Sequence, residues 1–218
     1  MTRAFVIGNG PSLATTPLEL LQKEISFACN RIHLLYPKTK WRPTHYVRGE
    51  EQSLKSAKKY HEEVRLHIEM GCEVWVNLWF TKFTDMGGKV HTIESCWHYT
   101  NHYYDDNSPH VWHLPRICSY GSSVNVAVQI AANLGYKPIY LLGCDLGYVD
   151  GKPSHFTEEY EKGIEDELRP ARLANLDTLA AHMTAARSSP VKIYNCTPVG
   201  LLHDLGVYEN VCMESLFQ

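Results

Sequence analysis

The stretch that decides the fold lies near the start of the chain and reads Phe5-Val6-Ile7-Gly8-Asn9-Gly10-Pro11-Ser12-Leu13. It begins within an unbroken apolar run, which is typical of a strand buried on both faces of a parallel sheet. A turn rich in glycine, asparagine and proline then ends the strand. Glycine lets the backbone approach a ligand closely, and asparagine offers both a donor and an acceptor. The turn therefore predicts a phosphate or nucleotide cradle, although the same residues also form ordinary tight turns.

This turn differs from two common phosphate-binding sequences. It does not follow the pattern Gly-x-Gly-x-x-Gly, and no lysine of the P-loop type comes after it. We therefore predict neither a dinucleotide site of the usual kind nor a P-loop.

Strand and helix patterns alternate along the rest of the chain. Further strands are expected at 25–29, 44–47, 73–77, 138–145 and 191–195, and helices from 16, at 51–70, at 122–134 and at 170–187. This alternation predicts an α/β fold, a Rossmann-like and mostly parallel sheet with helices on both faces. The last helix is expected to turn Leu173, Leu176, Leu179 and Met183 towards the core.

Residues 80–115 are different in kind, because they are crowded with histidine, tryptophan and tyrosine and show no clear period. We expect an insertion or lid that bears one short strand, within a single domain 1–218. A metal could bind among His91, His98, His102, His110 and His113. No carboxylate or cysteine pattern completes a ligand set, so no metal site is predicted. An interface between copies of the chain is an equal alternative to a lid.

Composition excludes several classes of function. The net charge is only −3, and no run of lysine and arginine could follow a phosphate backbone, so nucleic acid is not an expected partner. No apolar stretch approaches the roughly 20 residues of a membrane span. The 7 cysteines form no Cys-x-x-Cys pair and no signal peptide is recognisable, which predicts a cytoplasmic protein with free thiols.

The ends of the expected strands carry polar residues. Ligands of parallel sheets bind beyond the carboxyl ends of the strands, where this sequence has 8–12, Asn30-Arg31, Arg48-Gly49-Glu50, and Gly143 and Asp145 with Tyr148. Ser122 and Ser123 stand at the start of a helix, where backbone N–H groups and hydroxyls suit an anion. An ordinary helix N-cap explains this serine pair equally well.

His155 lies in the loop after the clearest strand, 138–145. Histidine is the natural general base for a hydroxyl nucleophile because its pKa lies near neutrality. The chain has 12 histidines, however, so composition alone does not single out His155.

Several of these segments resemble a known family. The turn 8–13 and Cys29-Asn30 resemble the first two strand ends of the bacterial lipooligosaccharide sialyltransferases, and 123–148 and 194–202 are similar to later segments of the same enzymes. The same skeleton occurs in motility accessory factor proteins that glycosylate flagellin, and in archaeal 6-hydroxymethylpterin diphosphokinases. His155-Phe156 followed by Tyr160 is familiar from this wider group. Residues 50–115 lie outside the resemblance.

The resemblance implies a nucleotide-dependent transferase, first of all a sialyltransferase-like glycosyltransferase. Such an enzyme moves a sugar from a CMP-activated or other nucleotide-activated donor to a hydroxyl of a glycan or another acceptor, and requires no metal. It implies that Asn9, Gly10, Asn30, Ser122 and Ser123 contact the nucleotide. With the strand-end residues Gly8, Pro11, Ser12, Gly143 and Asp145, these form the expected nucleotide-binding set.

Catalytic roles follow from the same resemblance. His155 would deprotonate the acceptor hydroxyl, and Tyr148 and Tyr160 would stabilise the departing phosphate. The family has an asparagine at the third strand end, where this chain has Arg48-Gly49-Glu50.

Two alternatives to a glycosyltransferase remain open. A pyrophosphokinase acting on a pterin-like alcohol would use ATP and Mg²⁺, with Glu50, Glu51 and Asp145 as candidate metal ligands. A non-catalytic nucleotide-binding module would keep the strand ends but would not need His155.

Overall fold

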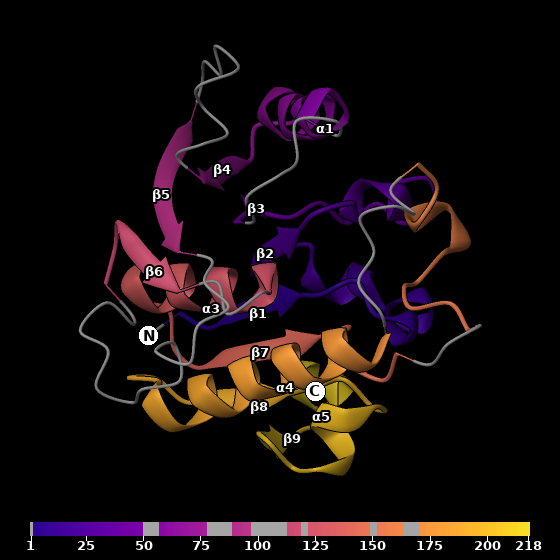
Figure 1. The fold of residues 1–218 in the computed structure, drawn as a ribbon, viewed down its shortest axis with the longest axis vertical. Helices are drawn as coiled ribbons and strands as arrows, with labels where there is room; N and C mark the ends of the chain where they lie inside the picture. Colours follow the sequence, from indigo (N-terminus) through magenta and orange to yellow (C-terminus); the bar gives the residue numbers. More distant parts are fainter. Residues whose placement is uncertain are drawn as a thin grey trace.

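One parallel sheet organises the chain. The structure, a computed structural model, describes residues 2–49, 57–77, 89–96, 113–118, 122–148, 152–163 and 171–218. Within these ranges the sheet has nine strands in the order β6-β5-β4-β3-β2-β1-β7-β8-β9 (Figure 1). Every neighbouring pair is parallel, which confirms the predicted α/β class.

The elements have the following bounds. The strands are β1 (Ala4–Ile7), β2 (Ile25–Cys29), β3 (His45–Arg48), β4 (Glu73–Asn77), β5 (Val90–Cys96), β6 (Arg116–Cys118), β7 (Ile139–Leu142), β8 (Ile193–Asn195) and β9 (Glu209–Asn210). The α-helices are α1 (Ala57–Glu69), α3 (Ser123–Asn133), α4 (Ala171–Ser188) and α5 (Leu201–Asp204). The 3₁₀ helices are η1 (Pro11–Thr15), η2 (Leu18–Leu21), η3 (Ile32–Leu35), η5 (Glu158–Tyr160) and η7 (Met213–Phe217).

The strand order reverses beside β1. The chain winds outward from β1 to β6, crosses back to place β7 against the other side of β1, and continues outward to β9. Ile7 of β1 is thereby flanked by Ala28 of β2 and Leu142 of β7. Ligands of doubly wound sheets bind at such a reversal, beyond the carboxyl ends of the strands. The fold therefore directs attention to the turns after β1 and β7.

Each face of the sheet carries its own core. Phe5 and Ile7 of β1 pack on one face with residues of the 3₁₀ helices and of α1, such as Leu13 and Val64. Ala4 and Val6, on the other face, pack into the core that α3 covers. All four residues of β1 are fully buried, as the apolar run predicted. Because both faces of the sheet are covered, apolar and polar residues do not alternate along β1.

The first connection differs from the sequence prediction, because two 3₁₀ helices stand where a helix starting near residue 16 was expected. Pro17 adopts φ −77° and ψ 73°, which is not helical. In a 3₁₀ helix, side chains at positions i and i+3 lie on the same side. Leu18 and Leu21 of η2 both reach the core in this way.

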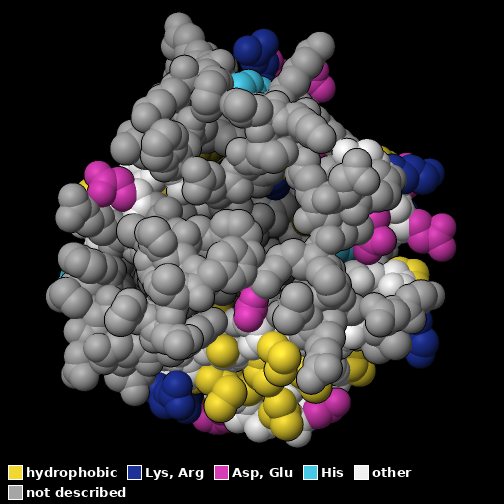
Figure 2. All heavy atoms as spheres, in the orientation of Figure 1, with side chains coloured by type: hydrophobic (Ala, Val, Ile, Leu, Met, Phe, Trp, Pro, Cys, Tyr) yellow, Lys and Arg dark blue, Asp and Glu magenta, His cyan; other side chains and the backbone are white. Residues whose placement is uncertain are grey.

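The predicted inner face of α4 is confirmed for Leu179, which packs against the core, and is wrong for two of the other residues. The side chain of Leu173 lies outside those described. Leu176 and Met183 are 53% and 43% exposed, and Figure 2 shows hydrophobic side chains gathered on the surface over this part of the fold. The buried residues of the described part of α4 are Ala181, His182, Thr184 and Ala185. Small alanine side chains allow close packing, and the Nδ1 of His182 is hydrogen-bonded to the Tyr208 hydroxyl at 3.0 Å.

The expected insertion at 80–115 contributes a strand to the main sheet. β5 pairs with β4 and places His91 against Glu73, with 2.7 Å between the imidazole Nε2 and a carboxylate oxygen. The prediction of a lid, and His98, His102 and His110, fall in the ranges 80–88 and 97–112, outside the described residues.

Among the described helices, none combines the length and the apolar composition that crossing a bilayer would take. Cys29, Cys72, Cys144, Cys196 and Cys212 are free thiols.

Candidate functional site

The turns after β1 and β7 are hydrogen-bonded to each other. The N–H of Gly8 donates to the Leu142 carbonyl at 2.8 Å, and the N–H of Gly10 donates to the Gly143 carbonyl at 2.8 Å. The two strand ends therefore stay together at the reversal of the sheet.

The glycines of the first turn are required by protein packing. A Cβ on Gly8 would lie 2.4 Å from the Gly143 carbonyl oxygen, and a Cβ on Gly10 would lie 2.0 Å from a carboxylate oxygen of Asp145. Neither approach leaves room for a side chain. The sequence predicted that these glycines allow a ligand to approach the backbone closely. In the structure they allow the turn after β7 to approach it.

Asp145 holds the first turn in place. Its carboxylate accepts hydrogen bonds from the Ser12 N–H at 2.9 Å and from the Ser12 hydroxyl at 2.8 Å. Burial raises the pKa of Asp145, and the two hydrogen bonds from Ser12 oppose that rise. The structure thus joins two predicted nucleotide-binding residues directly. Pro11 occupies the first turn of η1, and Gly143 adopts φ +62° against Leu13.

Asn9 joins three segments of the site. Its amide Nδ2 donates to the Cys29 carbonyl at 3.1 Å, and its backbone carbonyl accepts from the N–H of Phe156 at 3.1 Å. The amide Oδ1 is buried and has no hydrogen-bond partner in the part of the chain that the structure describes. A buried acceptor of this kind calls for a donor from outside the protein.

The side-chain amide of Asn30 is held through its oxygen, and its nitrogen is available to a ligand. It adopts φ +53°, a left-handed conformation that asparagine tolerates. Its Oδ1 accepts from Arg48 Nη1 at 3.0 Å and from the Ser123 hydroxyl at 3.1 Å. No described residue accepts from its Nδ2, which leaves that donor open to a ligand.

Ser122 and Ser123 begin α3, but they differ in their contacts. The Ser123 hydroxyl is bonded to Asn30, as above. Ser122 is the N-cap residue, and its side chain makes no capping hydrogen bond. The N-terminus of an 11-residue helix carries a partial positive charge and unpaired N–H groups, which favour an anion. The structure therefore brings Asn30 into direct contact with Ser123 at the start of α3.

His155 is oriented by a carboxylate. Its Nδ1 lies 3.2 Å from Glu161 Oε1, and its ring stacks on Tyr160 with 3.7 Å between the ring centroids. Burial lowers the pKa of His155; Glu161 counteracts this, and Arg31 lowers the pKa further. The imidazole is therefore neutral near pH 7. If Nδ1 donates to Glu161, Nε2 keeps the lone pair that a general base needs.

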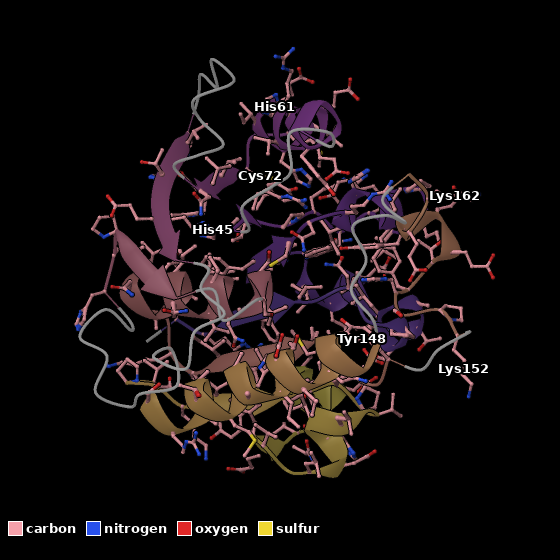
Figure 3. All side chains as sticks on the ribbon, viewed as in Figure 1. His45, His61, Cys72, Tyr148, Lys152 and Lys162 are labelled. Carbon is pink, nitrogen blue, oxygen red and sulfur yellow. The ribbon has the colours of Figure 1, made fainter. Side chains whose placement is uncertain are left out.

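The two predicted tyrosines both lie near His155. The ring of Tyr148 is 6.1 Å from the imidazole, and its backbone N–H and carbonyl are held by the side chain of Asn175 in α4. Tyr160 is buried beneath the imidazole. In Figure 3, Tyr148, Lys152 and Lys162 lie on the side of the molecule towards which β1 and β7 point.

Two residues anchor the His155 loop: Arg31, which the sequence placed at a strand end without a role, and Glu63, which the sequence did not indicate. Nη1 of Arg31 donates to the carbonyls of Glu159, Tyr160 and Lys162, and Nε of Arg31 lies 3.3 Å from a carboxylate oxygen of Glu63. Arg31 follows Asn30 directly, and this position at a strand end was its only signal. Glu63 gave no signal, because only the packing of α1 on the sheet brings it here.

Comparisons with known proteins agree with this architecture. No protein-family model and no curated protein sequence matches the chain. Among solved structures, the chain is similar to a MAf glycosyltransferase from Magnetospirillum magneticum AMB-1, with a TM-score of 0.60 and 16% identity over 98% of this chain and 34% of that one. It is also similar to the sialyltransferase CstII from Campylobacter jejuni, with a TM-score of 0.51 and 21% identity over 96% of this chain and 86% of that one.

These likenesses establish the fold. The chain shares its fold with the MAf glycosyltransferase and with the sialyltransferase CstII, as the sequence resemblance predicted. It spans about a third of the length of the MAf glycosyltransferase.

Proposed function

We propose that this chain is a nucleotide-dependent glycosyltransferase that moves a sugar from a CMP-activated or similar donor to an acceptor hydroxyl. The observation that carries the proposal is the oriented base, His155 with Glu161, tied to Asn9 at the reversal of the sheet. The two similar structures are those of a MAf glycosyltransferase and of the sialyltransferase CstII, the latter in complex with the substrate analogue CMP-3FNeuAc. We further propose that the chain works in the cytoplasm and without a metal.

The residues of the site have the following roles in this proposal. The buried Oδ1 of Asn9 and the amide nitrogen of Asn30 would bind polar groups of the nucleotide. The N-terminus of α3 at Ser122 would receive its phosphate. Tyr148 would donate its hydroxyl to the departing phosphate oxygen. The buried Tyr160 supports the imidazole by stacking, which is a narrower role than the sequence resemblance implies.

The reaction would be a single displacement. The acceptor oxygen forms a bond to the anomeric carbon while the bond from that carbon to the phosphate oxygen breaks. The leaving nucleotide keeps the electron pair, and the acceptor proton passes to Nε2 of His155. Placing the base and stabilising the leaving charge each accelerate such reactions by roughly 10² to 10⁴.

The contacts of Asp145 favour this chemistry over the pyrophosphokinase. That alternative needs Asp145 as a ligand of Mg²⁺, but both carboxylate oxygens accept hydrogen bonds from Ser12. The other two expected ligands, Glu50 and Glu51, lie outside the described residues.

Thermal shift with CMP, UMP, GDP, ATP–Mg²⁺ and their sugar conjugates tests the proposal. A ligand at 100 times its Kd adds about 2.7 kcal/mol of stability, which raises the Tm by several degrees in a chain of this size. We expect a CMP compound to give the largest shift. His155→Ala should give the same thermal shift as the wild type. Its rate of sugar transfer, or of donor hydrolysis in the absence of an acceptor, should fall by roughly 10² or more. Activity that consumes ATP and depends on Mg²⁺ would contradict the proposal.

A further inference from the structure

Two buried arginines share one carboxylate beneath the site. Glu63 of α1 places one carboxylate oxygen 3.3 Å from Arg31 Nε and the other 3.9 Å from Arg48 Nη1. The three side chains are only 8%, 3% and 5% exposed for Arg31, Arg48 and Glu63. Charges so far from water interact strongly, and two guanidinium groups in such a place require a countercharge.

Each arginine serves a different half of the site. Arg48 donates to Oδ1 of Asn30 and thereby fixes the amide that faces the expected nucleotide. Arg31 binds the carbonyls of residues 159, 160 and 162 and thereby fixes the segment that bears Glu161 and supports His155. The carboxylate of Glu63 forms an ion pair with both arginines and thus links the two halves of the site.

We propose that Glu63 is a positioning residue that holds the nucleotide half and the His155 half of the site in register through Arg48 and Arg31. It contacts no substrate itself. The proposal rests on the proposed function for the meaning of the two halves. Its structural content, the coupling of Asn30 to the His155 loop, stands on the contacts alone.

The imidazole of His155 reports on this arrangement. The groups that face it are Glu161, Arg31 and the rings of Tyr148 and Tyr160. Arg31 lowers the pKa of His155, and Glu63 neutralises part of the field of Arg31. Removing the charge of Glu63 should therefore lower the pKa of His155 further.

The test is Glu63→Gln, which keeps the shape of the side chain and removes its charge. The pKa of His155 is measured by NMR titration of the imidazole signals, assigned by their loss in His155→Gln, and the Kd of CMP is measured by calorimetry. We expect the His155 pKa to fall by on the order of half a unit. The Kd of CMP should rise several-fold, because Arg48 no longer holds Asn30 in place.

Glu62→Gln is the matched control, because Glu62 is the exposed neighbour of Glu63 on the same helix. The proposal is overturned if Glu63→Gln and Glu62→Gln have the same His155 pKa and the same CMP affinity. If Glu63→Gln does not fold, Glu63→Asp decides: a smaller fall of the same pKa supports the proposal, and unchanged values of both readouts overturn it. Should CMP fail to bind the wild-type chain, the proposed function fails, while the NMR titration still tests Glu63.

Discussion

At the scale of single residues, the carboxylate of Glu161 decides which nitrogen of His155 carries a proton. An acceptor 3.2 Å from Nδ1 favours the tautomer in which Nδ1 is protonated and Nε2 is free to act as the base. The carboxylate also raises the pKa of His155 against the effect of burial. Orientation and basicity therefore come from the same side chain.

Glu161→Gln separates these two effects. Gln can still accept the hydrogen bond but carries no charge, so the pKa of His155 should fall and the acid limb of the pH–rate profile should move to lower pH. Because the amide oxygen still orients the imidazole, the maximal rate should fall by much less than the roughly 10- to 100-fold loss expected when an orienting partner is removed altogether. The measurement is donor hydrolysis between pH 4 and 9. Glu158→Gln, an exposed change in η5, should leave the profile in place; an unmoved acid limb in Glu161→Gln would exclude Glu161 as the partner of the base.

The sequence predicted part of this site for a clear reason. Asn9 and Asn30 follow strands that end at the same edge of a parallel sheet, so strand assignment alone was enough to bring them together. Glu161 and Glu63 could not be predicted in the same way, since each meets its partner only after a loop or a helix has packed. Asp145 was found, but its hydrogen bonds to Ser12 depend on how the two turns meet.

At the scale of elements, α1 is held to the sheet by His67. The imidazole Nδ1 lies 2.7 Å from the carbonyl of Glu63, Nε2 lies 2.8 Å from the Tyr36 hydroxyl, and the ring stacks on Tyr46 with 3.6 Å between centroids. Burial lowers the pKa of His67 to about 4. Helix α1 also carries Glu63, so its packing on the sheet brings the Glu63 carboxylate to Arg31 and Arg48.

Protonation of His67 should therefore weaken the fold in acid. An unfolded histidine titrates near 6.5, so between pH 6.5 and 4 the unfolded chain binds a proton that the folded chain does not, and stability falls as pH falls. From pH 6.5 to 5 the loss for this one group is roughly 2 kcal/mol. His67→Gln should be less stable at pH 7 but should show a shallower decline to pH 5, measured by urea unfolding. The same slope in His67→Gln, in the partly exposed control His203→Gln and in wild type would contradict this role.

Elements were predicted well where local pattern and packing agree. Helix α3 and the positive φ of Gly135 after it follow the sequence closely, because an apolar stripe and a left-handed glycine cap point to the same helix end. In α4, Leu179 packs against the core, but Leu176 and Met183 are exposed and the fully packed side carries Ala181 and Ala185. Pattern identifies an amphipathic helix more reliably than the face it buries, since small residues can pack nearer to the sheet.

At the scale of the whole molecule, the last helical turn closes one face of the sheet next to the first strand. The ring of Phe217 stacks near Phe5 with 5.9 Å between centroids, and the Arg3 guanidinium lies 4.8 Å from the centroid of Phe217. Arg3 also donates to the carbonyl of Leu216 at 3.1 Å and pairs with Glu24 at 2.7 Å. The sheet thus depends on residues from both ends of the sequence for cover over β1.

Phe217→Ala should accordingly lower the stability of the entire domain and not only fray its end. Phe217 is partly buried, so the expected loss is about 1 to 2 kcal/mol, and the Tm should fall by a few degrees for a chain of this length. Phe217→Leu keeps most of the apolar contact, so its Tm should lie between the Tm of Phe217→Ala and that of the wild type. Because Phe217 covers the strand that leads into the site turn, weaker cover over Phe5 should also speed hydrogen exchange at the amides of Gly8 and Gly10. A lowered Tm with unchanged exchange at these two amides would show that the end of the chain stabilises the domain without supporting the site.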